Sequence, residues 1–195
     1  MKFAITSDQI DFYHKQGFIE FEDLLMVDPI SGAARFDLWR QDPAVKKMLF
    51  KPAFNKIVAE LFRTPVLRMG FDLLVDTAQA TPPPATSRIS LQEMSCVQPL
   101  AGALLILLSP LEEPSPDLLL PSKIGSGIFF QPHQVIDWPR LMKVPRLRCL
   151  IIGYAQKIAL YRLEPRNLYT HEWKKMGYAF GDRLTDATHP ILYRS

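Results

Sequence analysis

The sequence is poor in the residues that build metal sites and disulfides. Of its 195 residues, two are cysteine and four are histidine. No His-x-x-x-His or Cys-x-x-Cys spacing occurs, so no zinc site is indicated. Cys96 and Cys149 each lie within an apolar run. That setting favours buried free thiols in a reducing compartment over a disulfide.

Long apolar runs and nucleotide-binding motifs are also missing. The longest apolar run, residues 99–108, is about half the length that a membrane-spanning helix needs. Asp8 and Asp11 come too early for the apolar region of a signal peptide. Gly-x-Ser-x-Gly, P-loop and dinucleotide-binding patterns do not occur. We therefore expect a cytoplasmic protein without a membrane partner.

Positive charge is concentrated in the last third of the chain. Residues 140–195 hold 11 Lys and Arg against 4 Asp and Glu, whereas residues 1–139 hold 12 against 16. A basic segment of this kind can indicate an anionic partner such as nucleic acid. The charges are dispersed, however, and no helix-turn-helix is visible. A solvated face is the simpler interpretation.

The order of patterns predicts one α+β domain over residues 1–195, helical to about residue 64 and β-rich from about 65. Ser7 and Gly17 bound a first helix, and residues 18–21 suit a strand. Residues 33–63 suit helices that restart at Pro43 and Pro52, with Trp39, Phe54 and Phe62 in the core. Strands are expected at 66–75, 89–97, 103–108, 128–130, 150–154 and 158–161, loops at 81–87 and 111–121, and a helix at 167–176. This spacing suits a β-sandwich or jelly roll.

Four stretches resemble one known family, the phytanoyl-CoA dioxygenase-like group of Fe(II)/2-oxoglutarate oxygenases. Residues 6–19 are similar to its N-terminal helix, glycine and strand, residues 125–132 to its Gly-Asp strand, and residues 145–154 to its arginine-bearing strand. The tail with Gly177-Tyr178 and Gly181-Asp182 also fits. The resemblance covers most of a chain that is shorter than usual members. Short members occur in chlamydiae, so we expect a bacterial, chlamydial origin.

The resemblance implies a double-stranded β-helix (jelly-roll, cupin-like) barrel flanked by N-terminal helices. Its iron is held by two histidines and one carboxylate. By position, the His-x-Asp pair falls on Leu91 and Glu93, and the distal histidine falls near Ile136. The arginine that pairs with 2-oxoglutarate falls on Arg148. Leucine and isoleucine cannot bind a metal, so the resemblance indicates a pseudoenzyme that binds no cofactor and acts as a binding or regulatory protein.

Two alternatives stay open at this point. His133 lies three positions from Ile136 and, with Glu93 and a weak third ligand from Gln92 or Gln131, gives an active oxygenase with atypical ligands. Fe(II) and 2-oxoglutarate are expected as cofactors in that case alone. The second alternative is a metal-responsive nucleic-acid-binding regulator.

Arg148 and the other histidines have their own expectations. Arg148 either binds a small dicarboxylate or another anionic ligand, or forms a cross-strand salt bridge. We expect His14 at the edge of the first helix, His171 on the surface, and His189 as a residue of the tail.

Overall fold

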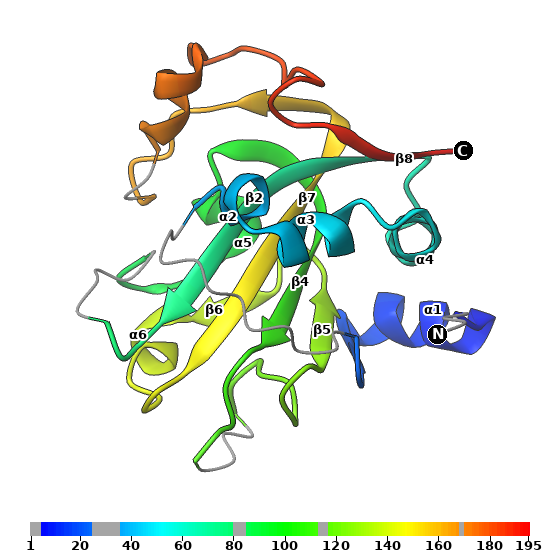
Figure 1. Cartoon of the computed structure of the whole chain (residues 1–195), viewed down its shortest axis with the longest axis vertical. Coiled ribbons are helices and arrows are strands. Elements are labelled where there is room, and N and C mark those ends of the chain that lie inside the picture. The colour runs from blue at the N-terminus through cyan, green and yellow to red at the C-terminus, as the bar shows by residue number, and fades with distance from the viewer. Residues whose placement is uncertain (1–4, 25–35, 80–84, 113–116, 168–169) are drawn as a thin grey trace.

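The computed structural model describes residues 5–24, 36–79, 85–112, 117–167 and 170–195. The N-terminal part is mainly helical, as expected, and the remainder is built from strands (Figure 1). Its elements are α1 (Ser7–Gln16), β1 (Phe18–Phe21), α2 (Leu38–Gln41), α3 (Pro43–Leu49) and α4 (Pro52–Leu61). The predicted helix at 33–35 and parts of the loops at 81–87 and 111–121 lie outside the described residues.

Side-chain caps set the helix starts. The Thr6 hydroxyl accepts the backbone N–H of Gln9 at 3.2 Å, and the Gln9 side chain accepts the N–H of Thr6 at 3.0 Å. This capping box places the first N-cap one residue before the predicted Ser7. The Asp42 carboxylate caps α3, and proline opens both α3 and α4. The predicted restarts at Pro43 and Pro52 are confirmed.

The strands form two antiparallel sheets. The large sheet has the order β1-β5-β4-β7-β2-β8, and the small one pairs β3 with β6. The elements of the β-rich part are β2 (Val66–Asp76), β3 (Arg88–Ser90), α5 (Leu91–Met94), β4 (Val97–Leu107), β5 (Gly127–Phe130), β6 (Val135–Asp137), α6 (Trp138–Leu141), β7 (Arg148–Tyr161), the 3-10 helix η1 (Glu172–Met176) and β8 (Ile191–Arg194). The α+β class is confirmed.

The large sheet separates two apolar cores. On one face Leu67, Leu104 and Ile152 pack against the helices, which also bury the predicted core residues Trp39, Phe54 and Phe62. On the other face Leu105 and Ile151 enter a second core that includes Ile89 and Ile136 of the small sheet. The large sheet curls, and the second core fills the inside of a half-barrel (Figure 1).

A bulge in β2 assigns residues to these two cores. The pairing of β2 with β7 shifts between Met69 and Phe71, so Met69 faces the helices and Phe71 faces the barrel interior. Phe71 lies opposite Gly153, and a Cβ atom added at Gly153 would come within 2.3 Å of the Phe71 ring. Glycine at this position therefore makes room for the ring.

Asp72 anchors α2 to the sheet from a buried position. Its two carboxylate oxygens accept the backbone N–H groups of Leu38 at 2.9 Å and Trp39 at 2.8 Å. Burial raises the pKa of the Asp72 carboxyl to about 6, while these two hydrogen bonds act in the opposite direction. The first turn of α2 is thereby tied to the centre of β2.

Several predicted elements were wrong in extent. The expected strand 89–97 is broken, because β3 ends at Ser90 and α5 follows. The two strands expected at 150–154 and 158–161 are one long strand, β7. The helix expected at 167–176 is reduced to η1, with 168–169 outside the described residues. The short elements β6, α6 and β8 were not predicted.

Candidate functional site

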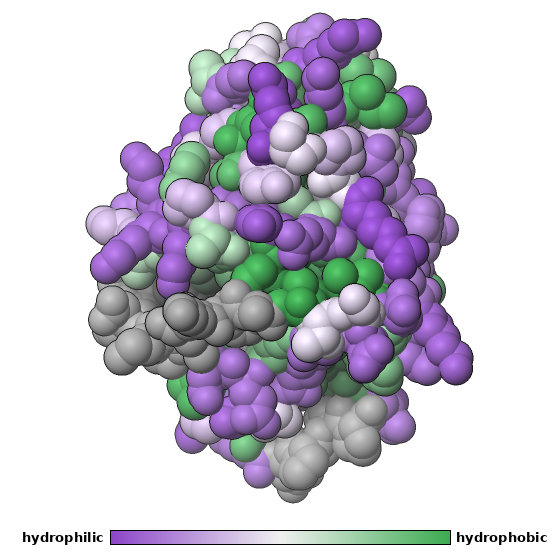
Figure 2. Space-filling view, turned by 90° about the vertical axis from the view of Figure 1, so that its right-hand side faces the viewer, coloured by the Kyte–Doolittle hydropathy of each residue, from purple (hydrophilic) through white to green (hydrophobic). Residues whose placement is uncertain are grey.

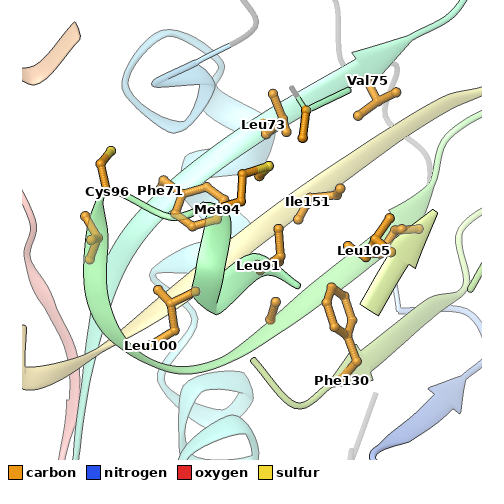
Figure 3. Packing of buried hydrophobic residues seen from close by; sticks show 14 of the residues in the cluster. Phe71, Leu73, Val75, Leu91, Met94, Cys96, Leu100, Leu105, Phe130 and Ile151 are labelled. Atoms are coloured by element: carbon orange, nitrogen blue, oxygen red, sulfur yellow. The ribbon is translucent and has the colours of Figure 1, made fainter. Parts of the chain in front are cut away.

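Leu91 is an apolar core residue of the barrel. It follows β3 as the first residue of α5 and is fully buried. Figure 3 shows it among the buried side chains inside the barrel, which include Phe71, Met94 and Ile151. The first ligand position of the expected triad therefore contributes an aliphatic contact to the core and no electron pair to a metal.

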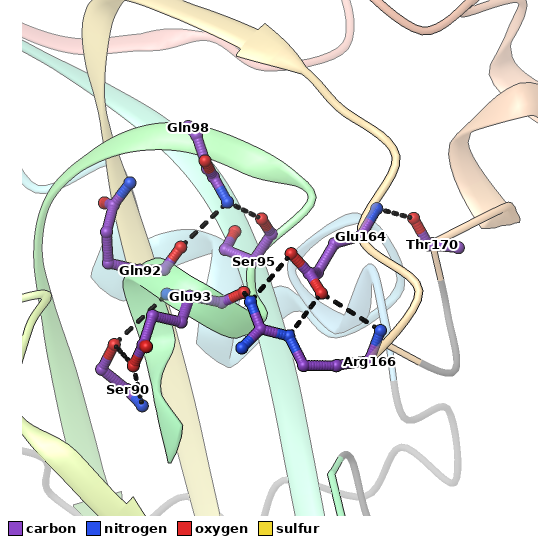
Figure 4. Close-up of polar contacts among 8 residues, drawn as sticks. All are labelled: Ser90, Gln92, Glu93, Ser95, Gln98, Glu164, Arg166 and Thr170. Atoms are coloured by element: carbon purple, nitrogen blue, oxygen red, sulfur yellow. Dashed lines mark hydrogen bonds and ion pairs between the residues drawn. The ribbon is translucent and has the colours of Figure 1, made fainter.

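Glu93 uses its carboxylate to cap α5. One carboxylate oxygen accepts the Ser90 hydroxyl at 2.7 Å and the Ser90 backbone N–H at 3.2 Å, and the Ser90 hydroxyl accepts the N–H of Glu93 (Figure 4). The hydrogen bond from the Ser90 side chain is the main reason that the pKa of Glu93 lies below its usual value. Glu93 is exposed, so its carboxylate lies on the outer side of α5.

Gln92 connects the triplet to the turn that precedes β6. Its backbone N–H donates to the carbonyl of Pro132 at 2.9 Å, and its side-chain carbonyl accepts the N–H of Leu100 at 2.9 Å. The turn carries His133, which is exposed. His133 also contributes, as one of the smaller causes, to the lowered pKa of Glu93. The structure thus brings His133 close to the triplet, as the atypical-ligand alternative requires.

Ile136 lies in the interior core. It pairs with Ile89 across the small sheet and is 4% exposed. The residue near which the distal histidine was expected is therefore apolar and enclosed. In antiparallel pairing, the end of β3 faces the start of β6, so the turn at His133 lies closer to the triplet than Ile136 does.

An ion pair that the sequence did not reveal lies beside the triplet. Arg166 donates to the backbone carbonyl of Glu93 at 2.9 Å, and its Nε lies 2.7 Å from a carboxylate oxygen of Glu164 (Figure 4). The backbone N–H of Glu164 donates in turn to the Thr170 hydroxyl at 2.9 Å. The sequence Glu164-Pro165-Arg166 could have suggested a local salt bridge. The hydrogen bond from Arg166 to α5 could not be predicted in this way, because it joins residues far apart in the chain.

The cavity beside α5 is small and apolar. It has a volume of about 20 Å³ and is lined by residues that include Phe71, Leu73, Met94, Cys96 and Trp173. That volume holds about one water molecule. Burial raises the pKa of the Cys96 thiol to about 12, so the thiol stays protonated and is a poor nucleophile or metal ligand.

The residues at the expected triad do not fit iron. Leu91 and Ile136 lack donor atoms, and Glu93 is engaged with Ser90. Within the described ranges, no three His, Cys, Asp or Glu side chains are grouped so that they could hold a metal ion.

Arg148 lies at the start of β7, opposite Asp76 of β2. Its Nε is 3.7 Å from a carboxylate oxygen of Asp76, and its backbone N–H donates to the Ser109 hydroxyl at 2.8 Å. The side chain is 30% exposed, and its Nε atom is buried. Its predicted pairing with a ligand carboxylate stays a prediction.

His189, expected as a tail residue, is part of the packed structure. It is buried, its Nδ1 lies 3.0 Å from the Tyr178 hydroxyl, and its ring packs edge-on against Trp173. Arg68 donates to its backbone carbonyl at 2.6 Å. His171 is exposed, as expected, and His14 is half-buried on α1. His189 therefore belongs to the structural core of the C-terminal segment.

A much larger groove opens on another side of the barrel. It has a volume of about 980 Å³ and is lined by residues of β1, β5 and β6 and by the connection after β4, including Phe18, Ile128, Val135, Leu118 and Leu119. Figure 2 shows the side of the molecule at the right of Figure 1, where hydrophilic residues surround a central hydrophobic area.

No described helix is both long and apolar enough to cross a membrane.

Comparison with solved structures identifies the fold. The chain is similar to the α-ketoglutarate-dependent carbocyclase SnoK of nogalamycin biosynthesis, with a TM-score of 0.67, 13% identity and 96% of both chains covered. It is equally similar to the epimerase SnoN of the same biosynthesis, with a TM-score of 0.69, 13% identity and 96% coverage of both chains. The protein CT296 of Chlamydia trachomatis matches with a TM-score of 0.51 and 18% identity over 80% of this chain and 99% of that one.

These similarities show a fold of the Fe/2-oxoglutarate oxygenase type, the double-stranded β-helix that the resemblance implied. SnoN has been crystallised with iron and α-ketoglutarate. No family model and no curated protein matches the sequence.

Proposed function

We propose that this protein has an oxygenase fold without iron catalysis and acts by binding, as a divergent phytanoyl-CoA dioxygenase-like protein. The observation that carries the proposal is the full burial of Leu91 in the interior core. The Glu93 carboxylate is bound to Ser90, and the cavity beside α5 has a volume of about 20 Å³. A metal would have to displace packed apolar side chains and break a helix cap. Of the cavity beside α5 and the large groove, the groove has more room for a ligand.

Anaerobic calorimetry with Fe(II), with and without 2-oxoglutarate, tests this proposal. We expect no stoichiometric iron binding and no 2-oxoglutarate turnover in air. Tight iron binding in a one-to-one ratio together with turnover of 2-oxoglutarate would overturn it.

A second candidate is an active oxygenase with atypical ligands. The hydrogen bond from Gln92 to Pro132 supports it, because this bond holds the turn with His133 next to the triplet. Glu93 would have to leave Ser90 to become the second ligand. His133→Ala should then abolish metal binding, whereas His171→Ala, which removes another exposed histidine, should leave it unchanged. Equal metal affinity of wild type and His133→Ala would exclude this candidate.

A further inference from the structure

The end of β7 presents a basic and aliphatic surface. Side chains alternate along a strand, so Ile158, Leu160 and Arg162 lie on one face, while Ala159 and Tyr161 are buried on the other. Arg183 pairs with Leu160 from the neighbouring segment and so joins the same face. In Figure 1 this part of β7 runs along the top of the molecule, beside the segment that leads to β8. We name Ile158, Leu160, Arg162 and Arg183 the β7 surface.

No direct ion pair with a described residue neutralises Arg162 or Arg183, the two arginines of the β7 surface. The nearby acidic side chains have other partners: Glu164 pairs with Arg166, Asp186 pairs with Arg68, and Asp182 accepts the backbone N–H of Ala179. Because Arg183 lies opposite Leu160, Arg162 is its diagonal neighbour on the same face, and an anion bound there would be attracted by both guanidinium groups.

The apolar part of this surface is aliphatic and strongly exposed. Ile158 is 68% exposed, the highest value among the large hydrophobic residues described, and Leu160 is partly exposed beside it. Aromatic side chains that would stack on nucleic-acid bases are missing from it, because Tyr161 points into the core. Aliphatic side chains between cations suit the boundary between lipid headgroups and acyl chains better than they suit a nucleic acid.

We propose that the β7 surface docks on an anionic phospholipid membrane, with Arg162 and Arg183 on the headgroup phosphates and Ile158 inserted among them. The expectation that the protein has no membrane partner rested on its lack of a spanning run, and peripheral binding needs none. This surface also explains part of the positive charge of the last third, whose other cations include Arg140, Arg148 and Arg166 in ion pairs. The inference is independent of the proposed loss of iron catalysis.

Co-sedimentation of the full chain with vesicles tests the proposal. One set of vesicles is phosphatidylcholine, and the other contains about one third phosphatidylglycerol, whose anionic headgroups attract Lys and Arg. We expect binding to the second set alone, and weaker binding as the salt concentration rises. Each arginine near such a surface contributes about fivefold to the affinity, so Arg162→Gln/Arg183→Gln should weaken binding about 25-fold. Ile158→Ser should weaken it about fivefold.

Two variants of matched chemistry serve as controls. Lys46→Gln/Lys47→Gln removes the same charge from two exposed lysines of α3, and Ile124→Ser removes an exposed aliphatic side chain elsewhere. Both should bind like the wild type, and circular dichroism should show that all variants are folded. Equal binding to the two vesicle sets, or equal weakening in the lysine control, would overturn the proposal. Loss of duplex DNA binding in the arginine variant, without any vesicle binding, would also overturn it.

Discussion

The carboxylate of Glu93 accepts two hydrogen bonds from Ser90, one from the hydroxyl at 2.7 Å and one from the backbone N–H at 3.2 Å. The oxygen atoms expected to face a metal instead close the first turn of α5. The residue that most resembles a metal ligand is therefore part of a capping box, and this role gives it a measurable effect on stability.

Ser90→Ala should lower the free energy of unfolding by about 1 kcal/mol, because it removes the N-cap of α5. The pKa of Glu93 should rise towards its usual value in the same variant, since the Ser90 hydroxyl is the main cause of its lowering. Thermal denaturation and carboxyl NMR titration measure the two effects. Ser87→Ala changes an exposed serine just before β3 and should alter neither.

Leu91→Ala should lower the free energy of unfolding by about 3 kcal/mol, because the deleted side chain leaves a cavity in a packed core. Leu91→Met keeps the volume and should cost less than about 1.5 kcal/mol. Urea denaturation of the two variants checks this difference. Equal, small losses in both would show that Leu91 does not fill the barrel interior.

His189 should make the fold sensitive to acid. Burial, with Arg40 and Arg68 nearby, lowers its pKa from 6.5 to about 3. A neutral His189 stabilises the folded state fully above pH 6.5, and this contribution is lost as the pH falls through that range to about 3. His189→Gln should therefore show a flatter decline of stability over this range than the exposed-site control His171→Gln. Parallel curves for the two variants would contradict the assignment.

The contribution of Asp72 to stability should depend on pH in the opposite direction. Its raised pKa means that its contribution to stability is greatest below pH 3.8 and is lost as the pH rises through about 6. The carboxyl carbon of Asp72 should show an NMR titration midpoint near pH 6. A midpoint below pH 4 for Asp72 would show that the amides of Leu38 and Trp39 outweigh burial.

The predictable parts of the fold are those with strong local signals. Asp42-Pro43 and Pro52 start helices through local backbone and capping preferences, and the apolar runs of β2 and β4 identify strands. The order of these elements, with the resemblance, led to the barrel. The short strand β6 escaped prediction because its three residues depend on pairing with β3, far away in the chain.

The sequence alone predicted that metal ligands are missing from the candidate site, but it did not predict the contacts that the residues there make instead. Leu91 and Ile136 could be identified as unable to bind metal from their chemistry alone. That Glu93 caps α5, that Arg166 reaches the Glu93 carbonyl, and that His189 is buried all depend on three-dimensional contacts. A histidine before a proline near the end of a chain has no local pattern that distinguishes burial from exposure.

The close fit of the Phe71 ring against Gly153 restricts how the two long strands β2 and β7 can align. The two residues are opposite each other in the pairing of β2 with β7. If β7 slipped by two residues, Ile151 or Ala155 would lie beneath the ring, and their side chains would need the space that it fills. Misaligned pairings of these apolar strands are therefore penalised by shape, although their hydrophobicity alone would tolerate them.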